Sequence, residues 1–375
     1  MSNSSPSLID ALAQLPDPRH ARGRRHPWSA LLLLLAVGLL TGANSQRALA
    51  RAGCHLRGAW LRRLGFRRSP SQATIHRLLC ALDVGRVEIV ICSWLAHVRG
   101  EWRQAAATWL DGIAIDGKTL RGARRLGAQD VHLLSARSAR DGLILAQLAV
   151  PDTTSEPMLV PQLLDRLVIR GQTITFDAAF TQWAVAQTVL ERGGAYLMVV
   201  KGNQPTLRRD IAEALAHRAR CTGHVERTES AHGRIERRSL WVAPALAVRE
   251  QVLGFPGARQ ILELSRHVRL KRSGQVREET VYAVTSLTSK QANADALLSL
   301  WRAHWGIENG EHWVRDAVFR EDQATTRTGH APEVLAAFRN LAISLIRLHR
   351  GPQITASREY YATHLGVLFR QLGIP

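Results

Sequence analysis

The apolar pattern of the chain changes near residue 111, and this change constrains the fold more than any other feature. Before it, apolar runs of helical length are separated by glycine and Ser-Pro breakers, as at Ala30–Leu40 and Val87–Val98. After it, short alternating segments are typical of strands, with Asp141-Gly142 as a turn between two of them. The sequence therefore predicts an all-α N-terminal domain followed by a layered α/β fold.

The α/β part is expected to begin with strands and then to alternate helix with strand. The first three strands are expected around Ile113–Ile115, at Val131–Ser135 and at Leu143–Val150. A helix, a strand, a helix and a strand then follow, at Pro157–Leu167, Gln172–Asp177, Thr181–Arg192 and Ala195–Val200.

From about residue 205 to 280 this alternation stops, and the segment is rich in charge. Its short strands are expected at Arg237–Val242, Gln260–Leu270 and Glu279–Leu287, and we interpret it as a β-rich insertion in the α/β domain. Beyond it, Ala292–Asp316 and Ala331–Leu348 have the spacing of long helices.

The charge balance points to a polyanionic partner. Lys and Arg total 50 against 31 Asp and Glu, a net charge of +19, and phosphate neutralisation is where such charge gains most. A soluble protein with a merely basic surface stays open as the alternative. Residues 1–110 hold 15 arginines and 5 acidic residues. The candidate DNA contacts in this region are Arg24, Arg25, Arg62, Arg63, Arg67 and Arg68.

Cysteine usage and hydropathy exclude several other classes of protein. The four cysteines show no CxxC spacing and no histidines at zinc-ligand intervals, which fits a reducing compartment. Met1–Pro16 lacks the basic start of a secretory signal peptide. Ala30–Leu40 falls short of the ~20 apolar residues of a membrane span, so we expect a buried helix there.

Three acidic residues lie where a metal site could assemble. Asp116 and Asp177 each end a predicted strand, and Glu308 lies in a later helix. Adjacent parallel strands present their ends close together, and a helix can add a third carboxylate. Such oxygen ligands suit Mg²⁺, and a pair of ions can activate an attacking hydroxyl and stabilise a leaving oxygen. By spacing alone the signal is weak, because any acid that ends a strand qualifies.

A phosphate-loop motif competes for the same residues. Gly112–Thr119 matches the pattern G-x4-G-K-[ST], which is typical of nucleotide hydrolases. Its interior, Ile113–Asp116, favours a strand over an open loop, and Gly122 and Gly127 interrupt the helix that should begin at Lys118. The nucleotide-hydrolase interpretation is therefore the weaker one.

Around these acids the sequence resembles the H-repeat-associated family of bacterial insertion-sequence transposases. The segments that carry the resemblance are Ala114–Gly122, Thr175–Gln182, Val200–Gln204, His304–Asn309, His312–Asp316, Glu321-Asp322, Arg339–Ile343 and Leu15–Arg19 with the leucine run that follows it. These motifs are long and in order, and the likeness extends over about residues 15–350.

The resemblance implies a ribonuclease H-like catalytic core with a DDE triad of Asp116, Asp177 and Glu308. The separations in this chain are 61 and 131 residues, and the second leaves room for the insertion. It implies an endonuclease that uses Mg²⁺ or Mn²⁺ to cleave DNA at the ends of an insertion sequence. The freed 3′-hydroxyl then attacks target DNA, which completes transposition, a form of DNA recombination.

The resemblance also implies partners and a place in the cell. Terminal inverted repeats and target DNA are the expected partners, bound by a homodimer or larger assembly because two ends are handled together. The expected location is the bacterial cytoplasm at the nucleoid, without a membrane. Two rival functions stay open, a catalytically silent DNA-binding relative of transposases and a ribonuclease H-like nuclease.

On this pattern the chain divides into five segments. They are a helical basic DNA-binding region at 1–108, the first part of the core at 109–204, the β-rich insertion at 205–280, the core completion with the Glu-bearing helix at 281–350, and a C-terminal tail at 351–375.

The residues around the last acid depart from the wider pattern of Tyr, Arg, Glu and Lys at steps of three, four and seven. Here those positions hold Trp301, His304, Glu308 and Arg315, which fall on one helix face. His304 and Arg315 are candidate DNA contacts, although histidine is only conditionally cationic near neutral pH.

Three residues near the aspartates and the expected sheet edge are further candidate DNA contacts. Lys118 follows Asp116 by two residues and is either a phosphate contact or a solvated turn residue. Lys201 and Asn203 follow the strand Ala195–Val200 and are favoured as DNA or active-site residues over plain turn residues.

Overall fold

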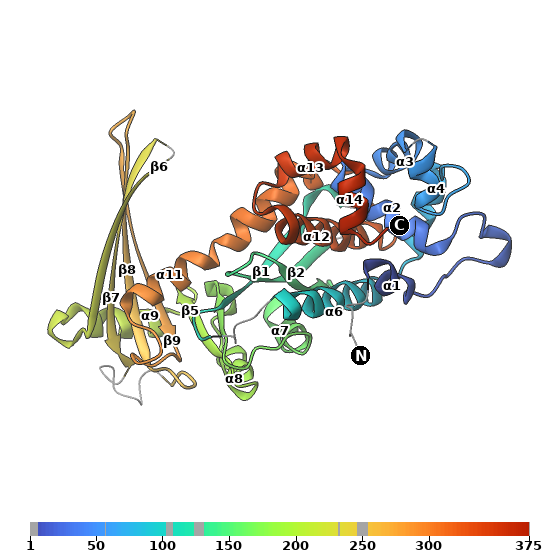
Figure 1. Cartoon of the computed structure of the whole chain (residues 1–375). Coiled ribbons are helices and arrows are strands. Elements are labelled where there is room, and N and C mark those ends of the chain that lie inside the picture. The colour runs from blue at the N-terminus through green and yellow to red at the C-terminus, as the bar shows by residue number, and fades with distance from the viewer. Residues whose placement is uncertain are drawn as a thin grey trace. The chain divides into compact units, whose positions relative to one another are not determined.

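The computed structural model describes residues 7–56, 58–102, 108–123, 131–231, 233–245 and 254–374 (Figure 1). The chain forms two compact units. The first unit combines residues 1–106, 117–155 and 308–375, and the second unit combines residues 107–116 and 156–307. The units are therefore discontinuous in sequence, unlike the five consecutive segments expected from the sequence.

The N-terminal part of the first unit is helical, as predicted. Its helices are α1 (Leu8–Ala13), α2 (Trp28–Leu40), α3 (Gln46–His55), α4 (Ala59–Arg63), α5 (Gln72–Ala81) and α6 (Val84–Trp102). Serine side chains cap α3 and α5, where Ser45 and Ser71 accept hydrogen bonds from the backbone of the first turn.

Helix α2 is apolar on all sides and lies in the core of the first unit. Every residue from Ala30 to Leu40 is buried, which confirms the predicted buried helix. Among the residues that the structure describes, no helix is both long and apolar enough to cross a membrane.

The C-terminal helices complete the same core. Helices α12 (Ala331–Arg350), α13 (Ile354–Thr363) and α14 (Leu365–Gln371) bury apolar side chains together with α2. In Figure 1 the red helices α12 and α13 lie beside the blue helix α2. The segment 351–375, expected to be a tail, therefore folds into two helices, with Tyr361 and Phe369 fully buried.

The first unit also contains a β-hairpin of β2 (Val131–Ser138) and β3 (Ile144–Val150). Gly142, in the predicted turn, has φ of 72°, a left-handed conformation that favours glycine. Helix α6 packs against β3. The strand β1 (Gly112–Leu120) gives its second half to this unit and its first half to the second unit.

The second unit is a mixed sheet in the order β1-β4-β5-β9-β8-β7-β6. The first three strands are parallel, and β4 (Thr173–Phe176) and β5 (Ala195–Val200) are the central pair. Helix α7 (Glu156–Leu164) precedes β4, and α8 (Trp183–Glu191) connects β4 to β5, as the alternation predicted. The remaining strands are antiparallel: β9 (Val276–Thr285), β8 (Gln260–Leu270), β7 (Arg234–Pro244) and β6 (Gly223–Ala231).

The insertion is β-rich, as predicted, but it begins with a helix. Helix α9 (Pro205–Ala216) has proline in its first turn, where the missing N–H costs nothing. Figure 1 shows β6 to β9 as long neighbouring strands. Short 3₁₀ turns complete the described chain, at Ala21–Gly23, Arg121–Ala123, Ala178–Phe180, Arg218–Arg220 and Glu321–Gln323.

Two expectations about the chemistry-bearing segments are decided by the backbone. Gly112–Leu120 is one continuous strand, so the open phosphate loop of a nucleotide hydrolase is absent there. The helix expected at Ala292–Asp316 is not a single α-helix. It consists of α11 (Ala294–His304) and two π-helical segments, Glu308–His312 and Val314–Val318. Such π segments in helices frequently lie at functional sites.

Candidate active site

Two of the three predicted acids end adjacent parallel strands in the second unit. In the register of β1 and β4, Ile115 pairs with Phe176, and Asp116 and Asp177 are the next residue of each strand. Neighbouring strands lie roughly 4.8 Å apart, so the two carboxylates leave the sheet side by side. Both residues are partly exposed. The strand arrangement expected for these two residues is therefore present.

The backbone around Asp177 is fixed by short hydrogen bonds. Its Oδ1 accepts a hydrogen bond from the backbone N–H of Ala178 at 2.6 Å. The side chain of Asn203 donates to the carbonyl of Ala178 at 2.8 Å, and that of Gln204 donates to the carbonyl of Thr181 at 2.6 Å. Asn203 thus holds the loop that follows the second aspartate.

Lys201 lies beside the second aspartate, at the edge where the sequence placed it. Its Nζ is 3.4 Å from Oδ1 of Asp177, and the two side chains are 53% and 44% exposed. Because both groups face solvent, this ion pair contributes little to stability. The ammonium group remains accessible to an anion at the same edge of the sheet.

His304 lies at the end of α11 and is buried, with 6% of its surface exposed. Its Nδ1 is 3.0 Å from the hydroxyl oxygen of Thr175, on β4 two residues before Asp177. Burial lowers the pKa of His304 to about 4, and the nearby charge of Asp177 offsets this only in part. His304 is therefore neutral near pH 7 and offers no positive charge to a phosphate.

Glu308 is the first residue of the first π-helical segment and is exposed. It belongs to the first unit, whereas Asp116 and Asp177 belong to the second. Within the described ranges, no group of three or more His, Cys, Asp or Glu side chains that could hold a metal ion is found. The two aspartates supply the hard oxygen donors that Mg²⁺ prefers.

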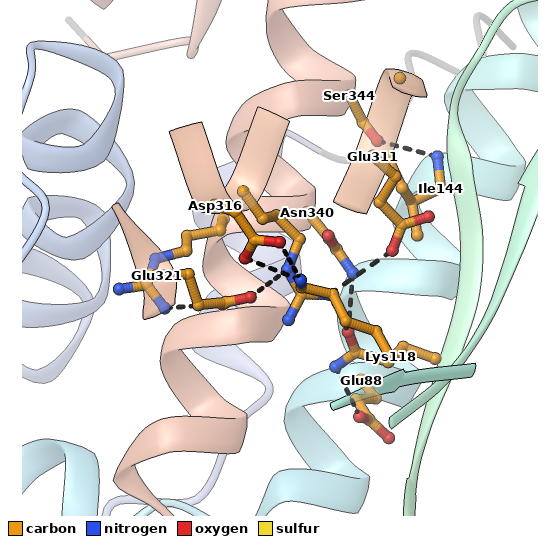
Figure 2. Close-up of polar contacts among 12 residues, drawn as sticks. Glu88, Lys118, Ile144, Glu311, Asp316, Glu321, Asn340 and Ser344 are labelled. Atoms are coloured by element: carbon orange, nitrogen blue, oxygen red, sulfur yellow. Dashed lines mark hydrogen bonds and ion pairs between the residues drawn. The ribbon is translucent and has the colours of Figure 1, made fainter. Parts of the chain in front are cut away.

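Arg315 lies inside the first unit, with no exposed surface. Its Nε donates to Glu321 Oε2 at 2.7 Å, and Arg339 Nη1 donates to Glu321 Oε1 at the same distance. Glu321 is thus held between two arginines (Figure 2). A buried arginine paired in this way cannot reach DNA, so the phosphate contact expected for Arg315 is replaced by an internal ion pair.

Lys118 is also internal. Its Nζ is 2.7 Å from both carboxylate oxygens of Asp316, and its side chain is 5% exposed (Figure 2). The alternatives expected from the sequence, a phosphate contact or a solvated turn, both require exposure. Lys118 has instead a structural partner, Asp316, which the sequence does not reveal because it lies 198 residues later.

A chain of amide and carboxylate groups continues from Arg315 through the first unit. Arg315 Nη1 donates to Gln147 Oε1 at 3.1 Å, and Asn340 donates to the same oxygen at 2.8 Å. Gln147 Nε2 in turn donates to Glu88 at 3.1 Å. These contacts join α6, β3 and α12 to the π-helical region (Figure 2).

The N-terminal arginines face solvent, as a DNA-contacting surface requires. All six candidates are exposed: Arg24, Arg25, Arg62, Arg63, Arg67 and Arg68. Arg62 and Arg67 line a surface hollow between α4 and the residues that follow it. Arg63 lies over the ring of Trp60 at 4.9 Å, so part of its role is packing.

Comparison with protein families gives two matches. Residues 110–345 match the family described as "Transposase DDE domain", which is more than half of the chain. Residues 9–95 match an associated family that accompanies this domain. The two matches cover the N-terminal helices and the segments that carry all three acids.

Comparison with individual proteins gives relatives of similar length. YncI of Escherichia coli O157:H7, which carries a transposase name, is 30% identical over 91% of this chain and 87% of its own. YhhI of E. coli K12, which carries the name of an H repeat-associated transposase, is 28% identical over 90% of each chain. A solved piggyBac transposase complex aligns at 12% identity with 98% of this chain and 78% of its own. Its TM-score of 0.42 is too low to support an argument.

Proposed function

The chain belongs to the family of transposases with a DDE domain, and we propose that Asp116, Asp177 and Glu308 are the carboxylates with which it cleaves and joins DNA. It is an insertion-sequence transposase, an enzyme of DNA cleavage and strand transfer. The observation that carries the assignment of residues is the strand register, in which Asp116 and Asp177 follow directly paired positions of β1 and β4.

The proposed site fits a hard divalent cation. Mg²⁺ or Mn²⁺ would be held by Asp116 and Asp177, with Glu308 as the third carboxylate, and when bound it would activate the attacking oxygen and stabilise the leaving one. We propose a ribonuclease H-like arrangement for the catalytic core. The protein's own part is to place the carboxylates and the DNA and to neutralise phosphate charge.

The proposed DNA contacts are the exposed cations. Lys201, beside Asp177, would contact phosphate next to the reacting bond, and Asn203 would hold the loop after Asp177. The six exposed N-terminal arginines would bind the backbone of the terminal inverted repeat. Transposition joins two element ends to one target, so we propose that a homodimer assembles on DNA.

The experiment compares the parent protein with Asp177→Asn on DNA that carries the terminal repeats of its own element. With Mg²⁺ or Mn²⁺ the parent is expected to nick and join the ends, and the variant to bind the same DNA without cutting it. Cleavage by Asp177→Asn at the parental rate would remove the proposed triad.

The same assay distinguishes the two rival functions. A parent protein that binds the terminal repeats but never cuts them is a silent DNA-binding relative. A parent protein that cuts unrelated DNA as readily as its own ends, without joining, is a nuclease. Specific cleavage followed by strand transfer supports the transposase mechanism with these residues.

A further inference from the structure

The ion pair of Lys118 and Asp316 joins the strand that carries Asp116 to the segment that follows Glu308. Lys118 is buried, and its Nζ is equidistant, at 2.7 Å, from both oxygens of Asp316. An ammonium group in such surroundings strongly requires its partner, because an unpaired buried charge is very unfavourable. The pair is therefore a fixed link between two segments that are far apart in sequence.

On one side of the link is β1. Asp116 and Lys118 are two residues apart on this continuous strand, so their side chains point to the same face. With Lys118 held at its end, the strand has little freedom to twist or slide. The direction in which the Asp116 carboxylate leaves the strand is thereby restricted.

On the other side is the π-helical region. Asp316 lies in the segment Val314–Val318, eight residues after Glu308. The neighbouring Arg315 holds the same segment to the interior through Glu321. Arg347 of α12 also donates a hydrogen bond to the carbonyl of Gly310, within the segment that Glu308 begins. The π-helical backbone is thus anchored at several points around Glu308.

We propose that the Lys118–Asp316 pair is a positioning device that sets Asp116 and Glu308 in the geometry needed to bind the metal ion. This proposal rests on the proposed function, since it takes both acids as metal ligands. Lys118 and Asp316 act through the segments that carry those acids and make no contact with DNA in this role. Groups of this kind, outside the ligands themselves, commonly change metal affinity about 10–100-fold when they are altered.

The test compares Lys118→Met, Lys118→Arg and Asp316→Asn in the full-length protein. Mn²⁺ binding is measured by calorimetry, and the Mn²⁺ dependence of cleavage is measured on DNA with the terminal repeats. We expect Mn²⁺ binding to weaken about tenfold in Lys118→Met and Asp316→Asn and to be largely kept in Lys118→Arg. Affinity for the DNA should stay within about twofold of the parent, because Lys118 is buried and does not touch it.

A matched control separates positioning from general stability. Arg99 and Asp141 form another ion pair in the first unit, at 2.8 Å, with side chains 12% and 28% exposed. Arg99→Met should lower the melting temperature in the manner of Lys118→Met but leave Mn²⁺ binding unchanged. If Arg99→Met and Lys118→Met change Mn²⁺ binding equally, or neither changes it, the positioning role is wrong.

Two further comparisons keep the outcome decisive. If Lys118→Met does not fold, Asp316→Asn is read alone, and parental Mn²⁺ binding in that variant overturns the proposal. Asp177→Asn is run alongside. When it abolishes cleavage while Lys118→Met leaves Mn²⁺ binding at the parental value, only the positioning role fails. When Asp177→Asn itself keeps parental Mn²⁺ binding and cleavage, the proposed function fails.

Discussion

Nδ1 of His304 lies 3.0 Å from the hydroxyl oxygen of Thr175, and this contact connects α11 to β4 two residues before Asp177. Both partners are buried, so neither has water as an alternative partner. The histidine at this position holds the helix to the strand of the second aspartate.

The first prediction concerns acid stability. The pKa of His304 is about 4 in the folded protein and about 6.5 when unfolded, so between these values only the unfolded chain takes up the proton. Stability therefore falls as the pH falls from 7 towards 4. From pH 7 to pH 5 this group should contribute a loss of about 2 kcal/mol.

His304→Asn keeps a polar side chain at this position and removes the titration. Urea unfolding at pH 7 and pH 5 should show a smaller acid-induced loss in the variant than in the parent. His312 has a pKa of about 3, lowered by burial, and acts in the same direction, but it is present in both proteins. Identical losses in parent and variant would show that His304 is not buried as a neutral group.

A second prediction concerns Lys201. Replacing it by Gln should weaken binding to terminal-repeat DNA and make the dependence of log K on log salt shallower by about 0.9. The melting temperature should change little, since the pair with Asp177 is solvent-exposed. Lys290→Gln is the matched control, because Lys290 is exposed on a turn away from the acids. Equal salt slopes for the two variants would remove Lys201 from the DNA contacts.

A third prediction separates the buried arginine from a DNA contact. Arg315→Met leaves Glu321 with one arginine instead of two and should destabilise the protein by about 3–5 kcal/mol, measured by chemical denaturation. The salt slope of DNA binding by the folded variant should equal that of the parent. A shallower slope with unchanged stability would return Arg315 to the surface role expected from the sequence.

A fourth prediction tests the N-terminal surface. The triple variant Arg62→Gln, Arg67→Gln and Arg68→Gln leaves Arg63 in place, because Arg63 packs over Trp60. DNA affinity should fall, and the salt slope should become shallower by up to about 0.9 for each arginine that meets a phosphate. Stability should be within about 0.5 kcal/mol of the parent. Unchanged affinity would show that this surface does not bind DNA.

Much of the element order could be predicted because apolar periodicity dominates it. The strands Ala195–Val200 and Gln260–Leu270 have the predicted bounds, since each reads as a bounded β-type run. Strand β6 and helix α9 were not predicted. Their buried positions are few, and exposed charged residues between them hide the period.

The backbone detail around Glu308 could not be predicted from periodicity. A π-helical segment keeps the apolar spacing of a helix on average, so the sequence suggests one continuous helix. The segment 351–375 was treated as a tail because its apolar residues are scattered. In the structure Tyr361 and Phe369 find their partners in a core made mostly by distant helices.

The candidate site divides in the same way. The ends of β1 and β4 follow from strand periodicity, so Asp116 and Asp177 could be placed together from the sequence. Burial of Lys118 and Arg315 could not, because their partners are set by tertiary packing. A buried cation and an exposed one look the same in a sequence motif.

Single-turnover cleavage of terminal-repeat DNA by Glu308→Gln tests the central claim most directly, because Glu308 is the acid that comes from the other unit. With Mg²⁺ and saturating protein, the cleavage rate should fall at least about a hundredfold, while DNA binding and melting temperature stay at the parental values. A variant that cuts its own ends within a few-fold of the parental rate would contradict the assignment of Glu308 to the metal site.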